Sequence, residues 1–337
     1  GDAIRKKEVE TGEQVKRAID AFCNPPKALD ELQVNYRAHD GIVGCAAEVV
    51  ELMYKLFPQS VDKLSKERGH FKGPKPAMLP WTEVDAVLSA MLSAEDCGAR
   101  EMGANQAVLV RNMEARARMP KALASAIVLT VEEAKGLEFD DVCLYDFFSD
   151  SSADADAWAV LNTLSGAGHG KEKAFDASAH SLLCEELKAL YVGITRARKR
   201  CFVFDRDEAR RQPAFDYFGK FAKVAEDGTE QELNATATAA GKTTEADWVR
   251  RGKNFVDNKL WAHAERAYLK GGASGVPEAF HAGGMRLASS AMGSKQAKVE
   301  KFKRAAIAFL KSATLRAPGK VGDRELFRAA KSFCVAA

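Results

Sequence analysis

Four short apolar runs in the middle of the chain constrain its fold more than any other feature. Each run is four to six residues long, is rich in Val, Ile, Leu, Cys and Phe, and is bounded by polar segments, which is typical of a buried strand. The runs are Ala107–Val110, Ala126–Val131, Val142–Phe147 and Cys201–Phe204. Helical segments lie between most of them. The repeated order of strand and helix therefore predicts an α/β fold, with a mostly parallel sheet flanked by helices.

The spacing of apolar residues also predicts helices around these runs. Gly41–Phe57 has one apolar face and is ended by Pro58, and Leu182–Arg196 has a similar pattern. A further helical pattern covers residues 84–92. Residues 66–80 are basic and rich in Gly and Pro, so the sequence predicts a loop there.

The chain is expected to divide into an α/β domain over residues 1–220, a linker over 221–247 and an all-α domain over 248–337. Residues 225–247 are small, polar and non-periodic, as in a linker. Beyond them, aromatic and small residues fall at the offsets of a tetratricopeptide repeat. These residues are Trp248, Gly252, Phe255, Ala264, Tyr268 and Gly271.

A second copy of this helical pattern is less regular. Gly293, Ala305 and Phe309 repeat the pattern of Gly252, Ala264 and Tyr268, but at an offset of 41 residues rather than the usual length of about 34. Two units do not make a self-sufficient solenoid. We therefore expect them to dock on the α/β domain or to continue into further repeats.

The composition excludes several classes of protein. With 46% hydrophobic and 29% charged residues, the chain is neither disordered nor collagenous nor a coiled coil. No apolar run approaches the roughly 18 residues of a membrane span, and the first residues lack both a signal peptide and a starting Met. The seven Cys and six His show no ligand or disulfide spacing. We expect a piece of a longer intracellular protein, cytoplasmic or nuclear, with reduced thiols and no metal site of its own.

Charge is distributed unevenly along the chain. Residues 242–337 hold 19 Lys and Arg against 8 Asp and Glu, whereas residues 1–241 hold 31 against 39. A basic region of this kind either approaches phosphate backbones and acidic partners or forms an ordinary solvated helix surface. Because no aromatic residues are interleaved for stacking, the sequence favours the solvated surface. A basic nucleic-acid-binding module over residues 242–337 stays open as a rival function.

Three segments carry the residues from which a site could be built. They are Gln33–His39, ahead of the first predicted helix; Leu129–Val142, where a strand leaves into a charged turn; and Glu185–Arg198, a helix whose last turn presents arginines. In a parallel sheet, groups at strand ends and in adjoining loops converge on one edge, where a ligand can reach them. We therefore expect the three segments to share one edge of the sheet.

Taken in order, these segments resemble the second RecA-like lobe of superfamily 1 helicases of the UvrD/Rep type. The chain has NYR at 35–37, AKGLEF at 134–139 and LYVGITRA at 190–197, the order of that family's motifs IV, V and VI. The resemblance covers roughly residues 1–217, and the helical tail makes the chain most like the large helicase-like proteins that carry tetratricopeptide and ankyrin repeats. It implies a RecA-like fold of the P-loop NTPase type.

The resemblance implies roles for two arginines and a tyrosine. Arg37 and Arg196 would reach the γ-phosphate of ATP as arginine fingers, because a planar guanidinium suits charge spread over phosphoryl oxygens. Tyr36 would stack on the adenine. From the residues alone, Arg196 could instead offset the dipole at a helix C-terminus, Arg37 could form a surface ion pair, and Tyr36 could belong to the core.

The second motif implies contacts to the sugar and to nucleic acid. Glu138 would accept hydrogen bonds from the ribose hydroxyls, and Gly136 would supply the backbone freedom of the turn. Thr130 would meet the nucleic-acid backbone through its hydroxyl. The chain departs from the family after Thr130, where Val131, Glu132 and Glu133 stand in place of the usual His and small residue. Two carboxylates facing a phosphate chain would repel it.

The motifs that hold phosphates and metal are missing. A phosphate-binding loop needs GxxxxGK[ST] after a strand. Residues 236–243 and 166–171 only imitate that motif, and Asp30–Gln33 spells a magnesium-binding motif without the apolar strand that would hold it. We therefore expect ATP and Mg²⁺ to be held mainly by an N-terminal RecA-like lobe of the same protein, and this chain alone to be inactive.

The sequence thus predicts the C-terminal motor lobe of an ATP-dependent helicase-like ATPase. Its partners would be the N-terminal lobe, single-stranded DNA or RNA, and a protein bound by the helical repeats. The alternative is a non-catalytic scaffold, in which a degenerate helicase lobe carries protein-binding repeats.

Overall fold

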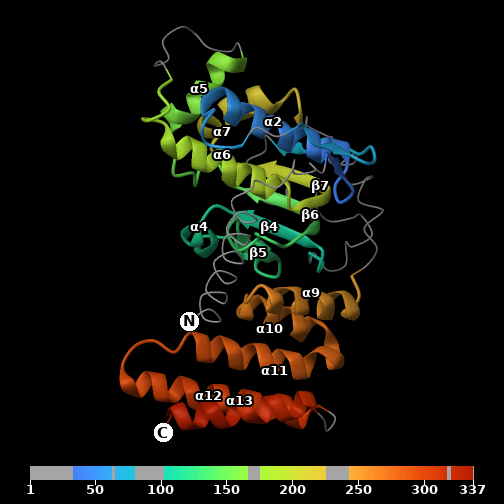
Figure 1. Ribbon diagram of the computed structural model, residues 1–337, viewed down its shortest axis with the longest axis vertical. Helices are drawn as coiled ribbons and strands as arrows, with labels where there is room; N and C mark the ends of the chain where they lie inside the picture. The colour runs from blue at the N-terminus through green and yellow to red at the C-terminus, as the bar shows by residue number, and fades with distance from the viewer. Residues whose placement is uncertain are drawn as a thin grey trace, which may run out of the picture.

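A six-stranded parallel sheet forms the centre of the larger domain (Figure 1). The computed structural model describes residues 33–62, 65–79, 102–165, 175–224, 243–316 and 320–336. The strand order is β5-β4-β6-β7-β3-β8. The strands are β3 (Ala77–Leu79), β4 (Gln106–Val110), β5 (Ile127–Thr130), β6 (Phe139–Tyr145), β7 (Ala197–Phe204) and β8 (Lys223–Val224). The sheet confirms the predicted α/β class.

All four predicted apolar runs are strands of this sheet, and they form its β5-β4-β6-β7 part. Two further strands were not predicted. β3 lies inside the segment 66–80 that was expected to be a loop, so that prediction is wrong for its last residues. β3 is only three residues long and follows Pro76, so the sequence pattern does not indicate a strand there. In the structure it is fully buried between β7 and β8.

Helices cover the sheet as the sequence predicted. α2 (Asp40–Leu56) presents Ile42, Val49 and Leu52 to the core, spaced for one helix face. α2 and α6 (Ser181–Ile194) pack on each other and on β7 at one face of the sheet. The other helices that the structure describes in this domain are α4 (Met113–Ala117), the 3₁₀ helix η2 (Lys121–Leu123), α5 (Ala155–Ser165) and α7 (Glu208–Phe218).

The two faces of the sheet bury different clusters. The first cluster joins α2, α5, α6 and α7 to the sheet and includes the buried Trp158. The second lies on the other face, where Val108, Cys143 and Phe202 meet Ala115 of α4 and Leu123 of η2. Both faces are therefore covered, as a parallel sheet requires.

In the part of the chain that the structure describes beyond residue 242, five helices stack one upon the next (Figure 1). They are α9 (Glu245–Asp257), α10 (Trp261–Lys270), α11 (Gly272–Ser289), α12 (Lys295–Thr314) and α13 (Lys320–Ala336). Thr244 and Asp247 form a capping box that begins α9. α9 thus begins inside the stretch expected as a linker, while residues 225–242 of that stretch and the helical pattern at 84–92 lie outside the described residues.

Small residues allow neighbouring helices to pack closely in this region. A Cβ added at Gly252 of α9 would lie 2.6 Å from the ring of Tyr268 in α10, so this glycine lets the two helices of the expected pair pack closely. The prediction that Gly293 is the equivalent of Gly252 in a second repeat is wrong, because Gly293 lies between α11 and α12 with φ +107°. Gly284 of α11 meets the Phe309 ring at 2.6 Å instead. The longer helices α11 and α12 shift the contact away from the repeat spacing.

The described cysteines predict a simple labelling pattern. Cys45, Cys143, Cys184 and Cys201 are buried free thiols, whereas Cys334 is exposed. Burial raises the pKa of Cys45 to about 12 and also raises the pKa of Cys143 and Cys201. A pKa near 12 lowers the thiolate fraction by about three orders of magnitude relative to a free thiol. Of these five cysteines, we expect maleimide to modify Cys334 first, as mapped by peptide mass spectrometry, and early modification of Cys143 would contradict the buried sheet.

None of the described helices is both long enough and apolar enough to span a membrane.

Candidate functional site

The segment Gln33–His39 is held at the sheet edge by a small sheet and a side-chain turn. β1 (Val34–Asn35) pairs in parallel with β2 (Arg68–Gly69). The Asn35 side chain accepts hydrogen bonds from the backbone N–H of Arg37 at 2.8 Å and of Ala38 at 2.9 Å, and its own Nδ2 donates to Glu67. This asparagine turn fixes the backbone that presents Tyr36 and Arg37.

Arg37, Glu138 and Arg196 meet at the amino-terminal edge of β6 and β7. Nη1 of Arg37 lies 3.1 Å from Oε1 of Glu138, and both side chains are somewhat more than one third exposed. Arg196 donates from Nη1 to the Leu137 carbonyl at 3.2 Å, next to Glu138. Its backbone carbonyl accepts from the N–H of Phe139 at 3.0 Å. Residues far apart in the sequence, from three separate motifs, therefore form one cluster.

Arg196 is a half-buried cation whose hydrogen bonds all go to uncharged groups. Besides Leu137, it donates from Nε to the Val192 carbonyl at 3.1 Å and from Nη2 to Thr195 Oγ1 at 3.2 Å. Burial lowers its pKa, the nearby Arg37 lowers it further, and Glu138 opposes this shift. Among the described side chains, no carboxylate lies within ion-pair distance of Arg196. An anion placed at this edge would supply the missing countercharge.

Tyr36, next to Arg37 in the chain, forms a tilted aromatic pair with His70. The Tyr36 side chain is 70% exposed, which is unusual for a large aromatic residue. Its ring centroid lies 4.6 Å from that of His70, with the planes inclined by 34°. The interpretation of Tyr36 as a core residue is therefore wrong. Sequence reasoning missed His70; the one available signal was its place in the basic loop 66–80.

Gly136 and Glu138 lie in the turn between β5 and β6. Gly136 has φ +81°, a left-handed conformation that favours glycine, so its predicted backbone role is confirmed. β5 ends at Thr130 and β6 begins at Phe139, and both strands pair in parallel with β4. The turn therefore crosses from the carboxyl edge of the sheet to the amino edge.

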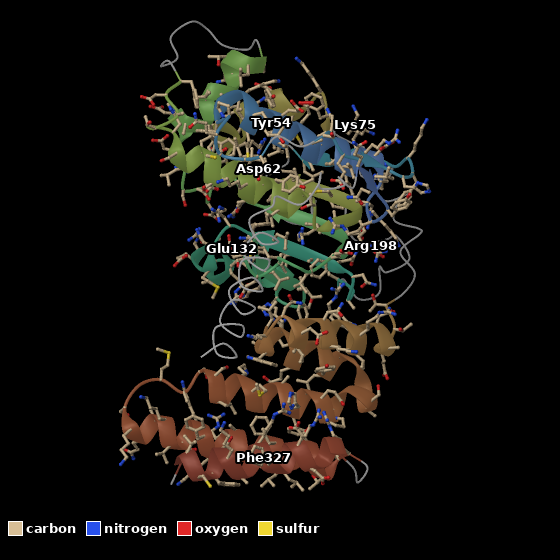
Figure 2. The ribbon with its side chains drawn as sticks, viewed as in Figure 1. Tyr54, Asp62, Lys75, Glu132, Arg198 and Phe327 are labelled. Carbon is tan, nitrogen blue, oxygen red and sulfur yellow. The ribbon has the colours of Figure 1, made fainter. Side chains whose placement is uncertain are left out.

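Thr130 does not join the cluster, so the expectation that all three segments share one edge is wrong for this residue. Figure 2 shows Glu132, which follows Thr130, and Arg198 at opposite ends of the strands. The Thr130 hydroxyl accepts from the N–H of Glu133 at 3.1 Å, and Glu133 in turn forms an ion pair with Arg116 at 2.7 Å. The Glu133 carboxylate therefore has a local structural role, because its charge is balanced by Arg116.

Within the described parts of the chain, no group of three or more His, Cys, Asp or Glu residues could hold a metal ion. The sequences that imitate phosphate- and magnesium-binding motifs lie largely outside the described residues.

Comparisons with known proteins agree with the fold of the sheet domain. Residues 107–205 match the UvrD-like helicase C-terminal domain family. The chain is 35% identical over 283 residues to the human TPR and ankyrin repeat-containing protein 1, a match that covers 77% of this chain and 10% of that protein. The chain therefore spans about a tenth of the length of this curated relative. No solved structure gives a significant match. We conclude that residues 107–205 are a UvrD-like helicase C-terminal domain, in a chain similar to part of a TPR and ankyrin repeat-containing protein.

Proposed function

We propose that this domain is the nucleotide-sensing C-terminal motor lobe of an ATP-dependent helicase-like ATPase. The observation that carries the proposal is the meeting of Arg37, Glu138 and Arg196 at one edge of the sheet. In the intact protein, an N-terminal lobe would hold ATP against this edge. Mg²⁺ bound by that lobe would neutralise part of the charge on the β- and γ-phosphates.

The unfilled hydrogen-bonding capacity of the arginines fits an oxyanion ligand. Nε of Arg37 is buried and has no hydrogen-bond partner among the described residues. Arg196 lacks a carboxylate partner, as described above. A phosphoryl group facing both guanidinium groups would satisfy donors that the protein leaves open, and it would lose hydration in exchange for fixed charges. Arg37 and Arg196 would thus stabilise charge that develops on the γ-phosphate.

The neighbouring side chains fit the rest of a nucleotide. Tyr36 presents an exposed ring in contact with His70, and such a ring suits stacking on adenine. Glu138 uses Oε1 for Arg37 and is 39% exposed, so its carboxylate remains accessible to ribose hydroxyls. Contact between Thr130 and nucleic acid stays a prediction. The Thr130 side chain is buried and its hydroxyl already accepts from the N–H of Glu133, and both facts weigh against such a contact.

The proposal is tested by ATP turnover of the full-length protein with and without single-stranded DNA or RNA. We expect turnover that rises when one of these polymers is added. A non-catalytic scaffold would bind its partners without ATP turnover under any of these conditions. A protein that binds nucleic acid only through residues 242–337 would show salt-sensitive binding that is independent of nucleotide.

Tyr36 provides a separate prediction on affinity. Removing the ring in Tyr36→Ala should weaken ATP binding by about 1 kcal/mol, roughly fivefold, because a stacking surface is lost. Tyr36→Phe keeps the flat ring and should bind ATP as the wild type does. Both affinities can be measured in the full-length protein with a fluorescent ATP analogue. Equal affinities for Tyr36→Ala and Tyr36→Phe would exclude adenine stacking on this residue.

A further inference from the structure

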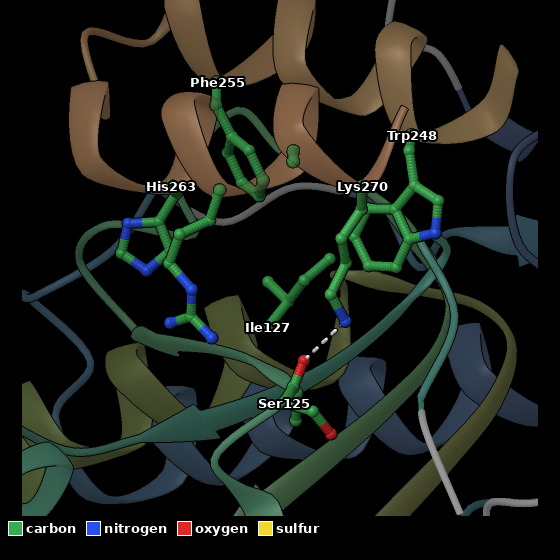
Figure 3. Close-up of a pocket in the computed structure, with 9 residues that line it drawn as sticks. Ser125, Ile127, Trp248, Phe255, His263 and Lys270 are labelled. Carbon is green, nitrogen blue, oxygen red and sulfur yellow. Dashed lines mark hydrogen bonds between the residues drawn. The ribbon is translucent and has the colours of Figure 1, made fainter. Parts of the chain in front are cut away.

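The helix pair α9 and α10 is packed closely against the edge of the sheet domain. Ile127 of β5 lies among Phe255, Trp248 and His263 (Figure 3). The cavity between them measures about 20 Å³, room for about one water molecule. Phe255 is buried in the same apolar cluster as the sheet. This interface is therefore a continuation of the core rather than a loose contact between domains.

Three basic side chains of α10 close the same interface with backbone hydrogen bonds. Nε2 of His263 lies 2.9 Å from the Val128 carbonyl, and Arg266 donates to the Ala124 carbonyl at 2.8 Å. Lys270 donates to the Ser125 carbonyl at 3.2 Å (Figure 3). Their acceptors lie in β5 and just before it. The helical region thus holds the strand from which the turn toward Glu138 departs.

Arg251 of α9 makes the most direct connection to the candidate site. It is only 4% exposed, and its guanidinium lies 4.2 Å from the centre of the Phe139 ring. It donates from Nε to the Ala104 carbonyl at 2.7 Å and from Nη2 to Oδ1 of Asn105 at 3.0 Å. Among the described residues no carboxylate forms an ion pair with it, so a charge is buried here on neutral partners alone. Such an arrangement is costly unless these contacts are well made.

The partners of Arg251 also hold the start of β6. The Asn105 carbonyl accepts from the N–H groups of Asp140 at 2.8 Å and Asp141 at 3.2 Å. The N–H of Phe139 donates to the Arg196 carbonyl at 3.0 Å. Phe139 therefore joins Arg251 on one side to Arg196 on the other, and Glu138 is its immediate neighbour.

A second contact reaches the other end of the turn. Oδ1 of Asn258, the residue that ends α9, would lie 3.1 Å from a Cβ added at Gly136. The helical region thus meets the turn at Gly136 and at Phe139, on either side of Glu138.

From these contacts we infer that α9 is a brace that fixes the turn carrying Glu138, and that Arg251 is its positioning residue. The helical region would then help to set nucleotide affinity, an inference that rests on the proposed function. Loss of Arg251 would loosen the start of β6 and disturb Glu138 and Arg196 together. The brace itself, however, can be tested without any nucleotide.

The experiment compares Arg251→Met with two control variants in the full-length protein. Arg250→Met changes the neighbouring arginine, which is exposed and pairs with Asp247 on its own helix. Phe309→Ala removes a buried ring of α12, remote from the sheet, and controls for general loss of stability in the helical region. Arg251→Lys keeps the charge over Phe139 but loses the planar fork.

The first measurement is hydrogen–deuterium exchange of the amides of residues 136–141 without nucleotide. We expect faster exchange in Arg251→Met, an intermediate rate in Arg251→Lys, and wild-type rates in both controls. Unchanged exchange in Arg251→Met, or an equal increase in Phe309→Ala, would overturn the brace.

The second measurement is the affinity for a fluorescent ATP analogue. We expect Arg251→Met to bind it about fivefold more weakly or worse, with Arg250→Met and Phe309→Ala unchanged. Wild-type affinity in Arg251→Met would overturn the coupling to nucleotide. Should the wild-type protein bind no nucleotide, the proposed function fails and the coupling with it, while the exchange rates still decide whether the brace exists.

Discussion

Replacing Arg196 by Ala should lower ATP turnover of the full-length protein by on the order of 10³-fold while leaving nucleotide affinity largely unchanged. The reason is the position of this guanidinium, which is fixed by three hydrogen bonds to uncharged groups and has no described carboxylate partner. A cation held in this way costs no reorganisation when charge develops on a phosphoryl group. In the proposed function, this guanidinium would therefore stabilise the transition state more than it stabilises bound ATP.

Arg198 supplies the matched control for this prediction. Arg198 is exposed, lies two residues further along the chain, and lies near the start of β7 at the same edge of the sheet (Figure 2). Arg198→Ala should keep wild-type turnover. Arg196→Lys keeps the charge but not the fork and should recover only a small part of the rate. Equal turnover of wild type and Arg196→Ala would remove Arg196 from the mechanism.

The strands and the motif order could be predicted because each depends on local sequence. The four apolar runs are buried strands, and a parallel sheet follows from the helices between them. Arg37, Glu138 and Arg196 could be expected to meet because each lies next to an element end. The resemblance to helicases added their roles, which neither strand patterns nor spacing supply.

Features that depend on tertiary packing could not be predicted in the same way. β3 is too short to show a period, and it is a strand only because β7 and β8 lie on either side. Thr130 and Glu138 are close in sequence, yet they lie at opposite edges because the turn crosses the sheet. Arg251 resembles any other arginine of a basic helix, and only the structure shows its guanidinium over Phe139.

The largest effect on stability is expected at Glu186, which lies in the segment Glu185–Arg198, just ahead of the LYVGITRA motif, but not in the candidate site. Its carboxylate is 1% exposed and accepts from Nε of Arg111 at 2.6 Å and from Nη2 at 2.8 Å. This ion pair joins the residue after β4 to α6, the helix that leads to Arg196. Glu186→Ala would leave the Arg111 charge nearly buried without a partner and should cost about 3–5 kcal/mol in unfolding free energy.

Glu185 and a double variant separate this effect from simple loss of charge. Glu185 is 65% exposed, and among the described residues its ion pair is with Lys188 one helical turn away, so Glu185→Ala should change stability by less than about 1 kcal/mol. Replacing both Arg111 and Glu186 by Met removes the unpaired charge and should recover most of the loss. Chemical denaturation of the three variants measures these differences. A double variant as unstable as Glu186→Ala would mean that α6 depends on the carboxylate for another reason, such as its hydrogen bond from the N–H of Ser152.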